Sequence, residues 1–281
     1  MRVTLWGTRG SLATPGPDTS HYGGETSCVE VRDGADNILV LDAGTGIRRL
    51  GKQLPPDIRR IDILLTHLHM DHIQGLAFFA PLFNPAIETH IWGPRSTTLT
   101  LRERIARYVS PPLFPVHLRD VAPHLLIQEI PQGDFDIEQF RVYAELVCHP
   151  NPTLGYRIEL GGGAMTYLPD HEPALGLRNG YVSGDWTSGY VLAEGTDVLI
   201  HDSQYSEEEY RSHVGWGHSS MEQAFTFAGL AGAKELVPFH HDPSHTDAVL
   251  DRLIEQTVKE MHPPFAVTPG IEGVTLTVGS S

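Results

Sequence analysis

The sequence is poor in cysteine, in basic residues and in long apolar runs. Its two cysteines, Cys28 and Cys148, form no C-x-x-C pair, which argues against a disulfide framework or zinc ribbon and favours buried thiols. Its 20 Lys and Arg residues stand against 35 Asp and Glu residues, and the resulting charge of −15 repels polyanions. No stretch approaches the roughly 18 apolar residues of a membrane span, and the N-terminus lacks a signal-peptide pattern. We therefore expect a cytoplasmic protein with no membrane partner and no stable nucleic-acid binding.

Size and composition are those of one globular domain. Residues 1–281 contain 40% apolar and 20% charged residues and no Pro/Ser-rich linker, so a single domain is expected. Strand-like apolar segments alternate with helical ones, which predicts an α/β fold. The last part of the chain, residues 266–278, is expected to close the sheet.

The densest group of chemically active side chains follows a buried strand expected at residues 61–66. His67, His69, Asp71 and His72 fall within six positions, a spacing that fits neither helical nor strand periodicity. Neutral imidazoles with a carboxylate and no nearby thiolate suit a borderline divalent cation, with zinc first. Loop histidines without a ligand are the alternative, but so dense a set favours a metal site at the C-terminal end of the strand.

Further candidate ligands stand where later strands end. His149 ends a strand before a proline turn, and taken alone it is as readily a loop histidine as a ligand. Asp170 has two oxygens that can bridge two cations. Asp185 competes for this role, but we favour Asp170 because a buried strand leads directly into it, whereas Asp185 lies in a segment typical of a surface loop. One of the adjacent His240 and His241, at the end of another strand, is expected to be the last ligand.

Two other polar residues allow more than one interpretation. His218 precedes an amphipathic helix over residues 221–231, for which Ser219 or Ser220 is the expected N-cap. A helix N-terminus favours anions, so His218 can contact a phosphate there or simply pack at the helix entrance. Asp42, also at a strand end, can be a ligand, can orient the ligand loop, or can cap the helix that follows it.

These motifs resemble those of a known superfamily. The segment from His67 to His72 resembles the defining motif of the metallo-β-lactamase superfamily. Within it, His149 followed by Gly155-Tyr156, and the G-H-S segment at His218, resemble the RNase Z-like and cyclic phosphodiesterase branch. The resemblance spans residues 7–245 and implies an αβ/βα four-layer sandwich, with two mixed β-sheets and helices on the outer faces.

The resemblance also implies a dinuclear site for two divalent cations, zinc most readily and manganese as the alternative. The implied ligands are His67, His69 and His149 for one cation, Asp71, His72 and His240 for the other, and Asp170 as the bridge. Supporting residues in the second shell would be Asp42, His201, Asp202 and His241. Two residues would be catalytic: His218 as general acid or phosphate-charge stabiliser, and Asp71 as the residue that orients the nucleophile. A homodimer is implied as well.

The implied reaction is hydrolysis of a small phosphodiester, such as a cyclic nucleotide or a ribose cyclic phosphate, by metal-activated hydroxide. A tRNA 3′-processing endonuclease is the main alternative, but the chain has no long basic or Gly/Pro-rich insertion to grip tRNA. A lactonase, lactamase or thioesterase and, in another class, a non-catalytic metal-stabilised binding protein are further alternatives. The His218 segment favours phosphate, and the complete ligand set favours catalysis. Residues 7–26 are a candidate functional rim, and residues 111–115 are a candidate lid or dimer contact.

Overall fold

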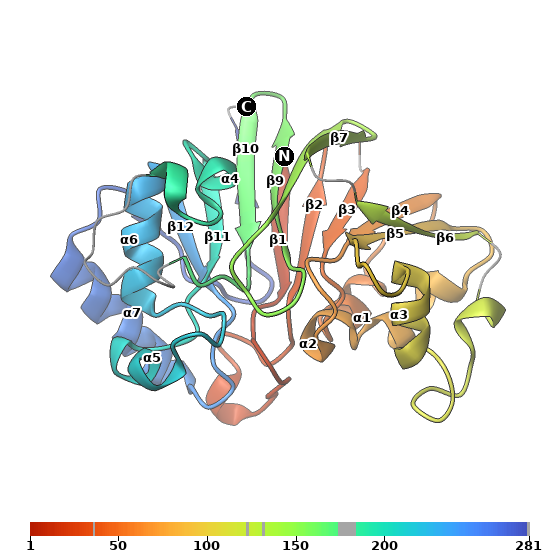
Figure 1. Cartoon of the computed structure of the whole chain (residues 1–281), viewed down its shortest axis with the longest axis horizontal. Coiled ribbons are helices and arrows are strands. Elements are labelled where there is room, and N and C mark those ends of the chain that lie inside the picture. The colour runs from red at the N-terminus through yellow and green to blue at the C-terminus, as the bar shows by residue number, and fades with distance from the viewer. Residues whose placement is uncertain (36, 122–123, 131–132, 174–183, 280–281) are drawn as a thin grey trace.

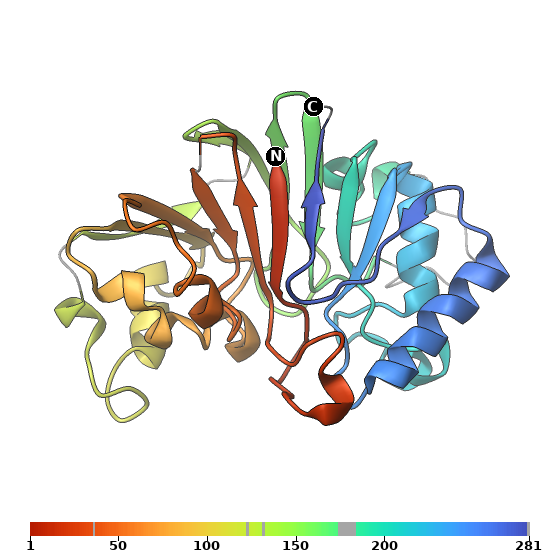
Figure 2. The same cartoon turned by 180° about the vertical axis from the view of Figure 1, so that it is seen from behind.

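The computed structural model describes residues 1–35, 37–121, 124–130, 133–173 and 184–279. Two seven-stranded β-sheets lie face to face, and helices cover the outer side of each (Figure 1 and, from behind, Figure 2). The expected sandwich of two mixed sheets with outer helices is therefore confirmed. In the described ranges, no helix combines the length and the apolar character needed to cross a bilayer.

The first sheet has the strand order β14-β1-β2-β3-β4-β5-β6. Strands β14, β1, β2 and β3 pair antiparallel, whereas β3, β4, β5 and β6 pair parallel. The strands are β1 (Arg2–Gly7), β2 (Cys28–Arg32), β3 (Ile38–Leu41), β4 (Arg60–Leu64), β5 (Glu88–Pro94), β6 (Leu125–Ile130) and β14 (Thr275–Thr277). The helices on this side are α1 (Ile47–Leu50), α2 (Met70–Ile73) and α3 (Leu101–Tyr108), with 3-10 helices η2 (Leu76–Phe78), η3 (Ala80–Phe83) and η4 (Leu118–Asp120). The 3-10 helix η1 (Pro17–Thr19) instead contacts α7 (Asp247–Met261) on the side of the second sheet.

The second sheet has the order β13-β12-β11-β10-β9-β8-β7. Its strands β7 to β10 form an antiparallel meander, and β10 to β13 are parallel. The strands are β7 (Gly133–Ile137), β8 (Phe140–Leu146), β9 (Leu154–Leu160), β10 (Gly163–Leu168), β11 (Val198–Asp202), β12 (Glu235–Phe239) and β13 (Ala266–Val267). The helices are η5 (Gly184–Trp186), α4 (Tyr190–Ala193), α5 (Glu207–His213), α6 (Met221–Ala231) and α7 (Asp247–Met261). Ser220 caps α6 by accepting from the Gln223 N–H, which selects it over Ser219.

The core consists of three apolar layers. Leu39 and Leu41 of β3 face the second sheet, whereas Ile38 and Val40 of the same strand face the helices, as the two-residue period of a strand requires. All four side chains are buried. Strands covered on both faces are mostly apolar along their length, and the polar residues of the candidate site stand at or just beyond the strand ends.

The C-terminal segment corrects one expectation. Residues 266–278 do not close a single sheet, because β13 pairs with β12 in the second sheet and β14 pairs with β1 in the first. The connection between them donates the Gly270 N–H to the Pro238 carbonyl and the Gly273 N–H to the Leu5 carbonyl. The segment therefore links the two sheets.

The carboxyl ends of the central parallel strands from both sheets meet at one edge of the sandwich. Five polar residues stand at this edge, where β3, β4, β10, β11 and β12 end: Asp42, His67, Asp170, Asp202 and His240. Crevices outside the carboxyl ends of strands are the usual location of sites in α/β folds.

Candidate metal centre

Asp42 holds the histidine loop in place. It follows β3 in the left-handed backbone region, with φ of 58°, and its side chain is fully buried. One carboxylate oxygen accepts from the Thr66 backbone N–H at 2.7 Å, and the other accepts from the Tyr167 hydroxyl at 3.1 Å and lies 2.8 Å from Nδ1 of His72. The Thr66 hydroxyl also donates to Asp42 and lies 3.1 Å from Nδ1 of His67. These bonds direct Nε2 of both histidines away from Asp42, toward the interior of the site.

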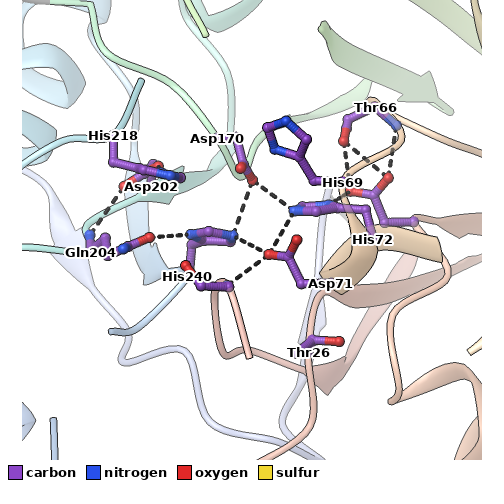
Figure 3. Close-up of polar contacts among 12 residues, drawn as sticks. Thr26, Thr66, His69, Asp71, His72, Asp170, Asp202, Gln204, His218 and His240 are labelled. Atoms are coloured by element: carbon purple, nitrogen blue, oxygen red, sulfur yellow. Dashed lines mark hydrogen bonds and ion pairs between the residues drawn. The ribbon is translucent and has the colours of Figure 1, made fainter. Parts of the chain in front are cut away.

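The seven residues expected to bind metal lie together in two groups. Figure 3 shows five of them: His69, Asp71, His72, Asp170 and His240. One group is His67, His69, His149 and Asp170, and the other is Asp71, His72 and His240. Asp170 faces both groups. Its Oδ2 lies 3.6 Å from Nε2 of His67 and 3.5 Å from Nε2 of His149, while its Oδ1 lies 2.9 Å from Nε2 of His72 and 3.2 Å from Nε2 of His240.

Three buried atoms in this cluster lack a hydrogen-bond partner among the described residues: His67 Nε2, His72 Nε2 and Asp170 Oδ1. The short distance between the last two atoms does not have hydrogen-bond geometry. Because an unpaired buried polar atom is costly, three that point at one another fit a bound cation.

The charges of the cluster suit the same ligand. Burial raises the pKa of Asp170, but the neighbouring His240 and His72 outweigh it and hold this pKa well below its ordinary value. Burial keeps the pKa of His67 well below its ordinary value, so this imidazole is neutral. Burial also lowers the pKa of His72, but three carboxylates led by Asp170 raise it well above normal. Bound metal ions would neutralise the negative charge of these carboxylates.

Two more histidines are oriented from outside the cluster. His149 donates from Nδ1 to the Gly217 carbonyl at 2.8 Å, and His240 donates from Nδ1 to Oε1 of Gln204 at 2.9 Å. Both rings therefore present Nε2 to Asp170, as metal-binding histidines do when a second partner fixes the tautomer. Gln204 has no motif signal in the sequence, since its role depends on the folded position of His240.

Replacing Gln204 by alanine is expected to weaken cation binding on the His240 side about 10- to 100-fold, because His240 loses the bond that aims its Nε2. A zinc titration in competition with a chelator of known affinity measures this change. The exposed Gln256 on α7 provides the control, and Gln256→Ala should bind zinc as the unmodified protein does. Equal zinc affinity in Gln204→Ala and in the unmodified protein would contradict the assignment.

His218 stands at the edge of the cluster. Its ring stacks on that of His240 with centroids 5.0 Å apart, and its Nδ1 donates to Oδ2 of Asp202 at 2.7 Å. Asp202 also accepts from the backbone N–H of Ser219 and of Gln204, so it is fixed on both sides. Burial lowers the pKa of His218, but Asp202 outweighs burial and raises this pKa to about 9. Asp202 thus contacts the candidate acid.

The other sequence candidates lie elsewhere. His201 shares a hydrogen bond with His171 at 2.9 Å and bonds the Asp202 carbonyl, which places it behind Asp202. His241 donates to the Gly270 carbonyl and packs on Tyr22, on the opposite side of the chain from His240. Asp185 lies in η5, and its side chain is outside the described part of the structure.

The long N-terminal loop contributes a contact that the sequence did not reveal. The Ser11 N–H donates to Oδ2 of Asp71 at 2.7 Å, with Ser11 in the left-handed region at φ 58°. Gly10 lies so close to the His240 ring that a Cβ there would approach it to 2.3 Å. Residues 7–26 therefore form part of the wall of the site. In the 111–115 segment, Phe114 packs edge-on against Phe78, and Leu113 is exposed.

Glu172 is a further residue that sequence reasoning missed. Its buried carboxylate accepts from the Tyr210 hydroxyl and from the backbone N–H groups of Gly215 and Gly217. Gly217 is the residue whose carbonyl orients His149, so Glu172 holds that loop against the cluster. Its position two residues after Asp170 is the only available sequence signal.

The chain is similar to members of one known superfamily. A family model described as a β-lactamase superfamily domain matches residues 37–241. A ribonuclease Z of Anoxybacillus flavithermus is 28% identical over 259 residues, covering 74% of this chain and 78% of the relative. A ribonuclease Z of Myxococcus xanthus is 26% identical, covering 95% of both chains.

Solved structures with the same fold are more distant in sequence. The metallo-β-lactamase fold protein YhfI from Bacillus subtilis has a TM-score of 0.71 at 18% identity, covering 98% of this chain and 99% of its own. Zn²⁺-bound PqqB from Methylobacterium extorquens has a TM-score of 0.69 at 20% identity, covering 99% of this chain and 100% of its own. A diphosphatase from the PhnP family has a TM-score of 0.69 at 18% identity, covering 98% of this chain and 97% of its own. These likenesses show the fold.

Proposed function

Because the chain belongs to the β-lactamase superfamily, as its histidine motif predicts, we propose that it is a dinuclear-metal-dependent hydrolase that cleaves a small phosphodiester. The observation that carries this proposal is the pair of ligand groups with Asp170 next to both, and with His218 held beside them by Asp202. Hydrolysis is in keeping with the relatives, which are named ribonuclease Z, and with the diphosphatase of the same fold.

The residues present fit two divalent cations. His67, His69 and His149 would hold one, Asp71, His72 and His240 the other, and Asp170 both, since it faces each group. The donor set of imidazoles and carboxylates favours zinc, with manganese as the alternative, and Zn²⁺-bound PqqB shares the fold. When bound, such a pair supplies Lewis-acid charge that activates water and neutralises charge on a phosphoryl group.

The protein side chains supply orientation and a proton. His218 keeps Nδ1 on Asp202, which leaves Nε2 to face the substrate as the proton donor to the departing ester oxygen. Asp71 is fixed by the Ser11 N–H and lies 3.2 Å from Nε2 of His240, so its position is set before any substrate binds. From there Asp71 orients the attacking water.

A tRNA 3′-processing endonuclease is the second candidate, since the relatives are named ribonuclease Z. The formal charge of −15 counts against it, because affinity for a polyanion depends strongly on neutralising its phosphates. The small phosphodiester is therefore the preferred substrate.

A hydrolysis panel separates the two candidates. Cyclic nucleotides, ribose cyclic phosphates and a precursor tRNA are each incubated with the protein and either Zn²⁺ or Mn²⁺. We expect turnover of the small cyclic phosphates and none of the precursor tRNA. Cleavage of the tRNA at its 3′ side would establish the second candidate, and metal binding without hydrolysis of any member would show a non-catalytic protein.

A further inference from the structure

A groove of about 350 Å³ opens beside the candidate metal centre. Three residues that line it also contact the cluster: Ser11 bonds Asp71, Gln204 bonds His240, and His218 stacks on His240. Figure 3 shows Gln204 and His218 on the same side of His240. The groove and the cluster thus share a wall, so the groove is within reach of one ester substituent of a phosphate that lies at the cluster.

One side of the groove is aromatic. The rings of Tyr205 and His213 stack with centroids 4.5 Å apart and an interplanar angle of 22°. Trp216 meets His213 edge-on at 4.7 Å, and 60% of its surface is exposed. A large indole held in place by its neighbours and still exposed beside a polar site is suited to stack on a flat ligand.

Two other residues that line the groove are acidic. Glu209 and Asp242 contribute carboxylates, and the residues that line the groove include no lysine or arginine. Oε1 of Glu209 also lies 3.0 Å from Nε2 of His245. Carboxylates accept hydrogen bonds and repel anions, so this groove disfavours a second phosphate and favours a ring that carries N–H groups.

We propose that the groove is a base subsite, and that the substrate is a nucleoside phosphodiester whose nucleobase stacks on Trp216. The groove is of the size usual for small-molecule sites, which begin at about 300 Å³. A chain of further nucleotides would bring additional phosphates to the carboxylates, so the preferred substrate is a single nucleotide rather than RNA. The position of the substrate phosphate at the cluster rests on the proposed function, whereas the stacking of the base on Trp216 does not.

Equilibrium binding tests the subsite without turnover. Adenosine monophosphate and ribose 5-phosphate are titrated calorimetrically into the full-length protein. We expect the nucleotide to bind about ten- to a hundredfold more tightly, which is the range for one base stacked on an aromatic side chain. Trp216→Ala should remove this preference, and Trp216→Phe should retain most of it. Trp186, which is 85% exposed and does not line the groove, provides the control in Trp186→Ala.

Equal affinity for the two ligands, or an unchanged preference in Trp216→Ala, would overturn the subsite. Hydrolysis of 2′,3′-cyclic adenosine monophosphate and of a ribose cyclic phosphate separates this result from the proposed function. Equal rates with both substrates would also refute the subsite while supporting phosphodiester hydrolysis. A base preference in binding without any hydrolysis would support the subsite and refute the hydrolase.

Discussion

Replacing Asp170 by alanine is expected to lower kcat/KM for phosphodiester hydrolysis at least about a thousandfold and to reduce the metal content below two ions per chain. Asp170 faces both ligand groups, so its loss should affect both proposed cations, whereas loss of one histidine should affect one. The variant also removes the carboxylate oxygen that lies 2.9 Å from Nε2 of His72 and 3.2 Å from Nε2 of His240. Metal content is measured by mass spectrometry alongside the kinetics.

Asp170→Asn provides a form of this test that keeps the shape of the buried side chain. It should reproduce the loss of activity while the circular dichroism spectrum stays unchanged. The rival carboxylate is tested by Asp185→Ala, which is expected to retain two metal ions and its activity. Full metal content and activity in Asp170→Asn, combined with their loss in Asp185→Ala, would transfer the bridging role to Asp185.

Replacing His218 by asparagine is expected to lower kcat about 10²- to 10⁴-fold while leaving two metal ions bound. His218 is held by Asp202 and belongs to neither set of proposed ligands, although it stacks on His240. A loss of activity at full metal content therefore distinguishes a proton donor from a ligand. Loss of one metal ion in this variant would instead make His218 a ligand together with Asp170 and His240.

A comparison of two leaving groups tests how His218 acts. If His218 protonates the departing oxygen, the variant should hydrolyse a p-nitrophenyl ester with a much smaller defect than an alkyl ester, because p-nitrophenolate leaves without a proton. An equal defect with both esters would show that His218 stabilises phosphate charge alone. Asp202→Asn is expected to follow the same pattern with a smaller loss, because Asp202 acts through the orientation of His218.

The contiguous motif could be found from the sequence because its members share one short loop. From His67 to His72, six positions supply four candidate ligands, and no regular element would place them together for another reason. The more distant members were found through strand ends. A buried strand leads into Asp170 and another into His240, and polar residues at such positions have only the edge of the sandwich to occupy.

Adjacent residues show where this reasoning stops. The residue pattern leaves His240 and His241 equivalent at one strand end, and only the resemblance to the superfamily favours His240. In the structure the backbone turns at His240, with φ of 60°, which directs that ring toward Asp170, while His241 points to Gly270. The residue pattern likewise could not show that the C-terminal segment is divided between two sheets.

From the sequence alone, the resemblance of the motifs to a known family determined the superfamily and the sandwich. Apolar periodicity and residues at strand ends determined the alternation of strands and helices and a set of residues able to bind metal. Only the tertiary structure decided which atoms orient the site. Ser11, Gln204 and Glu172 act through contacts with residues 60, 36 and 45 positions away, respectively. Such contacts exist only after the two sheets pack together, since hydrogen bonds between distant segments leave no local pattern in the chain.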